Sequence, residues 1–149
     1  MSLEIVLIPM AIALVTKAKS KSEENLPNVS MHEVSVETRM KNQDLLVNAM
    51  RNSGCEVSAL PNEIAGNFNS IYFSFRRDDN GIWNAIFTPG TTMQAATQII
   101  HSIDKAYGIE VQTELLRKIK ERAPQNGMTV ESETVNTDSS ISLILAVNQ

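Results

Sequence analysis

The stretch SIYFSFRRDDNGIWNAIFT, residues 70–88, decides the fold class, because it holds two β-rich runs around a turn. Residues 70–77 and 82–88 are rich in aromatic and β-branched side chains, which favour strands. Between them lies DDNG, residues 78–81, whose Asn-Gly pair is typical of a hairpin turn. Alternation divides the first strand into two faces, one with Ile71, Phe73 and Phe75 and the other with Tyr72, Ser74 and Arg76. We therefore expect an antiparallel hairpin with one buried face.

Upstream of the hairpin, the pattern predicts a strand, a helix and a second strand. In residues 34–36 valines alternate with a serine, as in a half-buried strand. Asn42 can cap a helix whose apolar residues recur at helical spacing and which Gly54 ends. Residues 55–60 are expected as the second strand. Residues 62–69, which contain one Gly and three Asn, are expected as a loop.

Downstream of the hairpin, a first helix is predicted. Thr91 and Gln94 have the spacing of a capping box, which marks the start of a helix. We expect this helix to end at Gly108. Its apolar stripe consists of Met93, Ala96, Ile99, Ile100 and Ile103.

A second helix and two strands complete the chain. The helix is expected over residues 110–123, with Glu114 and Lys118 as an ion pair four residues apart. Its apolar face consists of Val111, Leu115 and Ile119. Strands are expected at residues 128–135 and 141–147, joined by a polar turn. The order β-α-β-β-β-α-α-β-β predicts an α+β two-layer sandwich, a mostly antiparallel sheet with helices on one face.

The first 28 residues differ in composition from the rest. Residues 1–16 form an apolar leader whose one charge is Glu4. Its uninterrupted apolar run is shorter than the roughly 20 residues that cross a bilayer as a helix. Residues 17–28 are rich in Lys, Ser, Glu and Asn and predict an exposed polar linker. We therefore expect a single α+β domain at residues 29–149.

Two interpretations of the leader stay open. In one, residues 3–16 associate with the cytoplasmic face of a membrane, and a helix from Pro9 to about Lys21 directs its lysines toward anionic lipid. In the other, residues 4–8 are a buried strand and the rest is a buried helix. No positive region precedes the apolar run, so a cleaved secretion signal is not expected and the protein is expected in the cytoplasm.

The titratable residues exclude several kinds of site. One cysteine, Cys55, cannot form an internal disulfide, and with His32 and His101 it cannot supply a four-ligand Cys/His zinc site. No glycine-rich phosphate loop is present. His101 and Asp104 have the spacing of a base and its orienting carboxylate, but also that of an ordinary helix-surface pair, which we favour. We expect no metal, no cofactor and no catalytic site.

The exposed face of the 70–77 strand is one candidate interaction site. Tyr72, Arg76 and Arg77 combine an aromatic ring with cations, as the base-stacking sheets of RNA-recognition modules do. The Gly-aromatic-Gly pattern of those modules is missing, however, and the chain is acidic, with a pI near 5.2. Nucleic-acid binding is therefore the alternative rather than the leading interpretation.

The last helix carries the second candidate interaction site. Its basic residues are Arg117, Lys118, Lys120 and Arg122. Glu114 and Glu121 are interleaved with them, which is typical of a solvated helix face. An acidic segment of a partner protein is the other interpretation that we keep.

Two stretches carry a family resemblance. They are SVETRMKNQDLLVNAMRNSGCEV, residues 35–57, and KIKERAPQNGMTVESETVNTDSSISLILAV, residues 118–147. Together they resemble the small conserved plastid and cyanobacterial open-reading-frame family of the Ycf type, number thirty-five. Members resemble this chain in a Leu-rich helix that leads through Gly into a strand, and in an N-G-x-x-V strand before a final hydrophobic strand. The chain departs from the family at the leader and at residues 61–69.

The resemblance implies partner binding rather than catalysis. Relatives of that family resemble accessory proteins found with ATPases of the AAA class, and no catalytic residue set can be carried over. We therefore expect a non-enzymatic accessory or adaptor protein that acts by protein contact, with an AAA-type ATPase as the implied partner.

Overall fold

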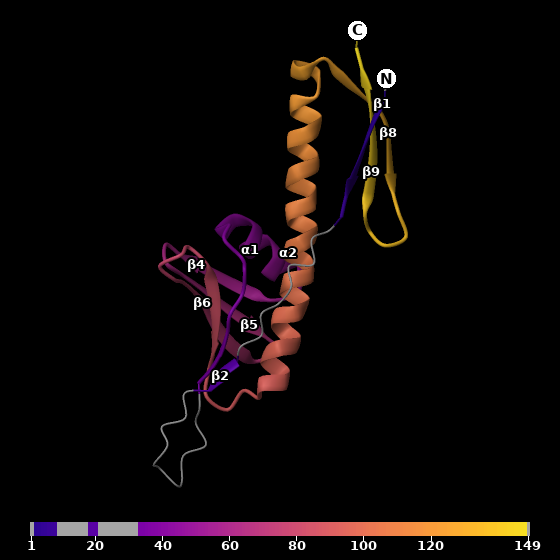
Figure 1. Ribbon diagram of the computed structural model, residues 1–149. Helices are drawn as coiled ribbons and strands as arrows, with labels where there is room; N and C mark the ends of the chain where they lie inside the picture. The colour runs from indigo at the N-terminus through magenta and orange to yellow at the C-terminus, as the bar shows by residue number, and fades with distance from the viewer. Residues whose placement is uncertain (1, 9–17, 21–32, 149) are drawn as a thin grey trace. The chain divides into compact units, whose positions relative to one another are not determined.

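The computed structural model describes residues 2–8, 18–20 and 33–148, and its backbone contacts divide the chain into two compact units (Figure 1). The large unit takes residues 11–107, and the small unit takes residues 1–10 and 108–149. Each unit has its own antiparallel sheet. The α+β class is thus confirmed, with the strands divided between two sheets rather than gathered in one.

The large unit contains a six-stranded sheet in the order β2-β3-β7-β6-β5-β4, antiparallel throughout. Its strands are β2 (Ala18–Ser20), β3 (Val34–Val36), β4 (Glu56–Leu60), β5 (Glu63–Phe68), β6 (Ile71–Arg77) and β7 (Trp83–Phe87). Strands β3, β4, β6 and β7 agree with the sequence prediction. Strand β2 falls inside the predicted linker, so that prediction is wrong for residues 18–20.

One face of this sheet is covered by helix α1 (Gln43–Asn52) and the first half of helix α2 (Met93–Arg122). The predicted cap of α1 is confirmed, since Asn42 Oδ1 accepts a hydrogen bond of 3.1 Å from the Leu45 amide. The buried side chains of this face come from alternate positions of the strands, from both helices and from the segment between β3 and α1. The largest are Trp83, Phe75, Phe87, Met40, Leu46, Met50, Ile64, Ile100 and Ile103.

The predicted β6–β7 hairpin is confirmed, and its turn shows why the sequence signals it. Gly81 has a φ of 78° and donates its amide to the Asp78 carbonyl at 3.0 Å. The Asp78 carboxylate accepts from the amides of Ile82 and Asn80 at 3.0 and 2.8 Å. These bonds, above all that from Ile82, hold the pKa of Asp78 below its ordinary value. An ionised aspartate therefore closes the loop.

Residues 62–69 are not a loop, and this prediction is wrong. They contain β5, which pairs with β4 and β6 on either side. A Cβ atom at Gly66 would stand 2.7 Å from two ring carbons of Phe73 and 2.8 Å from Met50 Cε. Gly66 therefore marks a close approach of core side chains to the strand, not a turn. The turn comes later, at Asn69 and Ser70, whose φ values of 48° and 66° are those of a two-residue hairpin loop.

The helix predicted to stop at Gly108 continues to Arg122 as part of α2, so the two predicted helices are one. A single interior glycine costs a helix only about 1 kcal/mol relative to alanine, and no proline follows before Pro124. The start also differs from the predicted capping box. Thr92, not Thr91, caps α2, because Thr92 Oγ1 accepts from the Ala95 amide at 3.1 Å.

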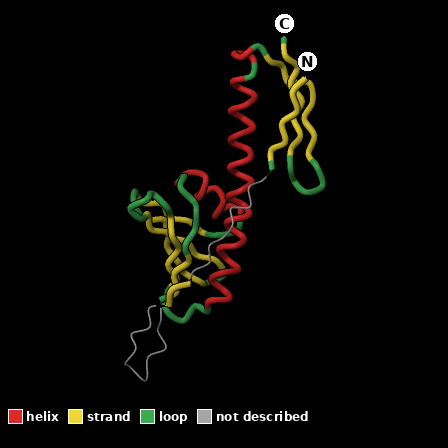
Figure 2. The backbone as a smooth tube through the Cα atoms, in the orientation of Figure 1, coloured by secondary structure: helices red, strands yellow, loops and turns green. Residues whose placement is uncertain are grey.

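The small unit contains a three-stranded sheet in the order β1-β9-β8 (Figure 2). Its elements are β1 (Ser2–Leu7), the short helix η1 (Pro124–Asn126), β8 (Met128–Val135) and β9 (Ile141–Val147). The last two strands have the predicted bounds. Ala123, Leu143 and Leu145 form the centre of the core, surrounded by Ile5, Leu116, Ile119, Met128 and Val130. All seven aromatic residues of the chain lie in the large unit, so this core is aliphatic.

The second half of α2 faces this sheet with a different stripe from the predicted one. Gln112, Leu116, Ile119 and Ala123 are its inward residues. Leu115, which was predicted to face inward, is 44% exposed. The predicted Glu114–Lys118 ion pair is replaced by Arg117, which contacts Glu114 at 2.6 Å and Glu121 at 2.9 Å.

The leader is described in part. Residues 2–7 are strand β1, which pairs along its whole length with β9. A strand was one of the two interpretations of the leader, but the burial expected for it is wrong, because only Leu7 of β1 is buried. Within the helix predicted from Pro9 to Lys21, residues 18–20 are strand β2, so the prediction is wrong for them. The other positions of that helix lie outside the described residues, as do residues 21–28 of the linker. Among the described residues, neither helix combines the length and the hydropathy that spanning a bilayer requires.

Candidate functional site

A shallow groove of about 290 Å³ lies on the small unit, between the last turns of α2 and the edge strand β1. Apolar side chains form most of its lining: Leu3, Ile5, Leu115, Ile119, Ala123, Met128 and Leu145. Lys118, Arg122 and Asn126 are its polar residues. Leu3 on β1 is 47% exposed and Leu115 on α2 is 44% exposed. The groove therefore exposes apolar surface.

The groove lies on the side of the last turns of α2 that faces β1. Successive helical residues are turned by about 100°, so Leu115, Lys118 and Arg122 share this side of α2 and Lys120 lies on another. Lys120 Nζ contacts the Glu133 carboxylate of β8 at 2.5 Å. This contact joins the last turns of α2 to β8, the edge of the sheet opposite β1.

The four basic residues predicted as an interaction site divide into two pairs. Arg117 is neutralised by Glu114 and Glu121, and Lys120 by Glu133. The hydrogen bond from Arg117 is the main reason why the pKa of Glu114 lies below its ordinary value, and the more distant charge of Lys118 contributes in the same direction. Among the described residues, no carboxylate lies within ion-pair distance of Lys118 or Arg122. These two line the groove with their charges unpaired.

The other predicted site, on the six-stranded sheet, is not assembled in the same way. Tyr72 is 57% exposed on the uncovered face, and Arg76 on the same face contacts Glu63 at 3.7 Å. Four strand residues separate them by about 13 Å. Arg77 points to the other face, where its guanidinium lies close to Gly81 in the hairpin turn. The three residues proposed to bind nucleic acid together are therefore not brought together.

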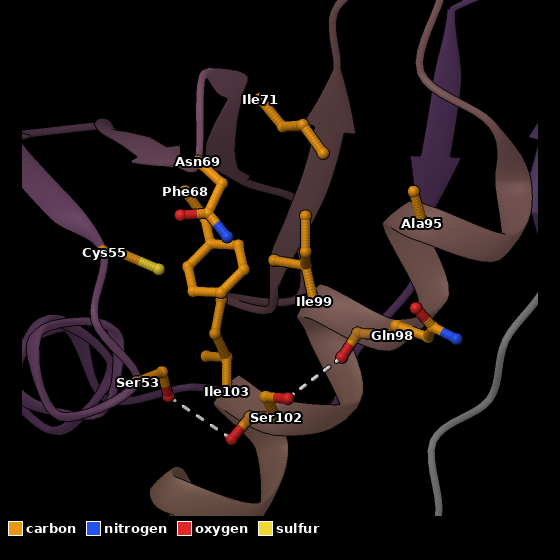
Figure 3. A pocket seen from close by; sticks show the side chains of 10 residues that line it. All are labelled: Ser53, Cys55, Phe68, Asn69, Ile71, Ala95, Gln98, Ile99, Ser102 and Ile103. Carbon is orange, nitrogen blue, oxygen red and sulfur yellow. Dashed lines mark hydrogen bonds between the residues drawn. The ribbon is translucent and has the colours of Figure 1, made fainter.

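A second cavity, of about 260 Å³, lies in the large unit between the end of α1, the β5–β6 turn and the first half of α2 (Figure 3). Ile99, Ile103, Phe68 and Ile71 form its apolar wall, and no charged residue lines it. The hydroxyl of Ser102 donates to the Gln98 carbonyl at 3.1 Å, so it is engaged by its own helix. This cavity holds no constellation for proton transfer or metal binding.

Cys55 lines the same cavity as a buried free thiol. Burial raises its pKa, so the thiol form is favoured over the reactive thiolate. The structure therefore gives Cys55 the character of a packing residue.

His101 and Asp104, the pair considered as a catalytic base and its orienter, differ in burial. His101 is exposed on α2, whereas Asp104 is 6% exposed. Burial raises the pKa of Asp104, and the charge of His101 lowers it to a smaller degree. The described residues contain no group of three His, Cys, Asp or Glu side chains that could hold a metal ion here or elsewhere.

We expect Asp104→Asn to stabilise the large unit at pH 7. A folded-state pKa above the ordinary value of about 3.9 means that ionised Asp104 opposes folding, so stability falls as the pH rises from that value through the raised pKa. The free energy of unfolding of the variant should exceed that of the wild type at pH 7 and equal it near pH 3.5. Urea unfolding followed by the fluorescence of Trp83, which is buried in the same unit, checks this. Equal stabilities at both pH values would contradict it.

Sequence reasoning missed Gln112, which is 5% exposed. Its amide Nε2 donates to the carbonyls of Leu7 and Ser139, each at 2.9 Å. One side chain thereby fixes both the end of β1, the strand whose Leu3 and Ile5 line the groove, and the β8–β9 turn. The only signal in the sequence was a polar residue on the inward side of an amphipathic helix.

Comparison with protein-family models, with curated proteins and with solved structures finds no match to this chain.

Proposed function

We propose that the protein is a non-enzymatic accessory or adaptor protein that binds a protein partner through the groove of the small unit. The observation that carries this proposal is the combination of two half-exposed leucines, Leu3 and Leu115, with the unpaired cations Lys118 and Arg122 in one groove. Buried apolar contacts supply most of the affinity of such an interface, and charges at its rim supply orientation and specificity.

The end of a helix alone does not account for these residues. A cation in the last turn of α2 interacts favourably with the helix dipole, and this would explain Arg122 by itself. It does not explain an apolar groove beside the cation, nor the exposure of Leu115 next to the partly buried Leu116. A surface that receives a partner accounts for all three features.

The family resemblance points in the same direction. It implies an accessory protein, and an AAA-type ATPase is the partner that it suggests. The second of the two stretches that carry the resemblance, residues 118–147, includes most of the groove residues, at the end of α2 and on strands β8 and β9, but not Leu3, Ile5 or Leu115. We propose such an ATPase as the first candidate to test.

The proposal can be tested with a photo-crosslinking residue, benzoylphenylalanine, placed at Leu115 in the full-length protein in cells. Leu60 is the matched control, because it is a 54% exposed leucine on the edge strand β4 of the large unit. We expect a discrete protein adduct from position 115, and at least about tenfold less of it from position 60, because only position 115 lies at the proposed interface. Equal adducts from both positions, or none from position 115, would refute the groove as the binding surface.

A further inference from the structure

Resting on the proposed function, we infer that the segment which occupies the groove is an acidic amphipathic α-helix of the partner, seated beside α2 over strand β1. The inference rests on three features of the small unit: the uncovered strip of its sheet, the spacing of its unpaired cations, and the position of its acidic residues.

The sheet is wider than the one helix that packs on it. Three strands about 4.8 Å apart present a face roughly 14 Å wide, of which one helix with its side chains covers about 10 Å, so a strip about one strand wide is left uncovered. The Lys120–Glu133 contact holds α2 toward β8, so the strip that is left uncovered is the one above β1. Leu3 and Ile5 of β1 form the floor of this strip, and Leu115 and Ile119 form its wall. A second helix laid beside α2 would rest on this strip with its apolar side and extend past the edge of the sheet.

The two unpaired cations of the groove indicate which charges the bound segment carries and how far apart these charges lie. Lys118 and Arg122 are four residues apart, which places them about 6 Å from each other along the axis of α2. Carboxylates at positions i and i+4 of a neighbouring helix have the same spacing. Such a helix would pair with both cations while its apolar side enters the groove. Arg122 could also take a carboxylate in a bidentate arrangement.

Nearby carboxylates argue against a broad anionic surface as the occupant. Glu114 and Glu121 lie on the exposed side of α2, next to the face that carries Lys118 and Arg122. A membrane or a nucleic acid that covered α2 would bring phosphates against these two residues. A single helix that enters the groove meets Lys118 and Arg122 without covering Glu114 and Glu121.

A second copy of this chain fits less well. In a symmetric dimer built on the groove, the same patch meets itself, so Lys118 and Arg122 of both copies would be brought to one interface. Like charges that meet at an interface cost binding free energy. A partner with acidic residues removes this cost.

The test is a selection from a library of helices whose charge varies, so that the binding preference itself reports the charge of the bound segment. A displayed library of 20-residue amphipathic helices keeps leucine on one face and places Glu, Lys or Gln at random on the flanking positions. It is selected on the full-length protein, and clones that still bind Leu115→Asp protein are removed. We expect the remaining clones to be enriched in Glu pairs at i and i+4. We expect their affinity to fall at least tenfold for Lys118→Glu/Arg122→Glu.

The matched control is Lys41→Glu/Arg51→Glu, which makes the same change of net charge on exposed residues of the large unit and should leave the affinity within twofold. Clones that depend on Leu115 but show no excess of Glu, or an excess of Lys, would overturn the inference. So would the absence of clones that depend on Leu115, or anionic vesicles that displace the selected helices. The crosslinks at Leu115 decide the proposed function separately, whatever the charge of the bound segment.

Discussion

Gly66→Ala lowers the free energy of unfolding of the large unit by about 2 kcal/mol, which is in the range measured for overpacked cores. The added methyl group would meet the Phe73 ring at 2.7 Å and Met50 Cε at 2.8 Å. The end of a methionine can move, but the Phe73 ring is held by two neighbours. It stacks on Phe87 with a centroid separation of 5.0 Å and meets Phe75 edge-on at 5.9 Å. The strand and the ring must therefore separate.

A double-mutant cycle isolates this contact from other effects of the glycine. Phe73→Leu removes the ring, so Gly66→Ala should cost at least 1 kcal/mol less in that background than in the wild type, a coupling of about the size seen for residues in contact. Urea unfolding monitored by Trp83 fluorescence measures all four proteins. An equal cost of Gly66→Ala in both backgrounds would show that Phe73 is not the reason for a glycine in β5.

Gln112→Leu should lower the stability of the small unit by about 3 kcal/mol, because it leaves two carbonyl groups without their donor. The Gln112 amide bonds the carbonyls of Leu7 and Ser139 at 2.9 Å each, from a side chain that is 5% exposed. Leucine fills a similar volume but donates no hydrogen bond. Strand β1 and the β8–β9 turn both lose their attachment to α2.

The measurement must report on the small unit, which contains neither tryptophan nor tyrosine. Hydrogen exchange of the β9 amides, which bond to both β1 and β8, does so directly. We expect exchange to accelerate about 100-fold for a loss of about 3 kcal/mol. Gln94→Leu, an exposed position of α2 in the large unit, is the control and should leave the β9 amides unchanged. Protection of β9 that is the same in both variants would contradict the role assigned to Gln112.

The elements that could be predicted are those whose cause is local. The β6–β7 hairpin follows from alternation and from Asp78 and Gly81 in one short turn. Helix α1 follows from its cap, Asn42. Strands β8 and β9 have the predicted bounds because each is a long β-rich run next to turn residues.

The errors come from causes that are distant in the chain. Gly66 looked like a loop residue because its reason, the Phe73 ring, lies on the neighbouring strand. Gly108 looked like a helix end, but nothing beside it stops the helix. Leu115 and Leu116 are adjacent and equally apolar, so only packing against the three-stranded sheet decides which of them faces the core.

The candidate site could be predicted in composition but not in arrangement. The sequence singles out the four basic residues from Arg117 to Arg122 as a possible contact for an acidic partner. It cannot show that Glu133, on another element, neutralises Lys120, or that Lys118 and Arg122 stay unpaired beside an apolar groove. The groove itself depends on β1, which lies more than 100 residues in the chain from the last turns of α2 that line it. Local patterns in the sequence do not predict which distant segments pair.

The most direct test of protein contact through the groove is affinity purification of the full-length protein from nuclease-treated extract. The tag follows a long flexible linker, and the wild type is compared with Leu115→Asp and with Tyr72→Ala/Arg76→Ala/Arg77→Ala. We expect one protein partner to be recovered after nuclease treatment. The recovered amount of this partner should fall at least about tenfold with Leu115→Asp and stay unchanged with the triple variant. Retention of the partner by Leu115→Asp, or loss of every co-purifying species on nuclease treatment, would contradict the proposal.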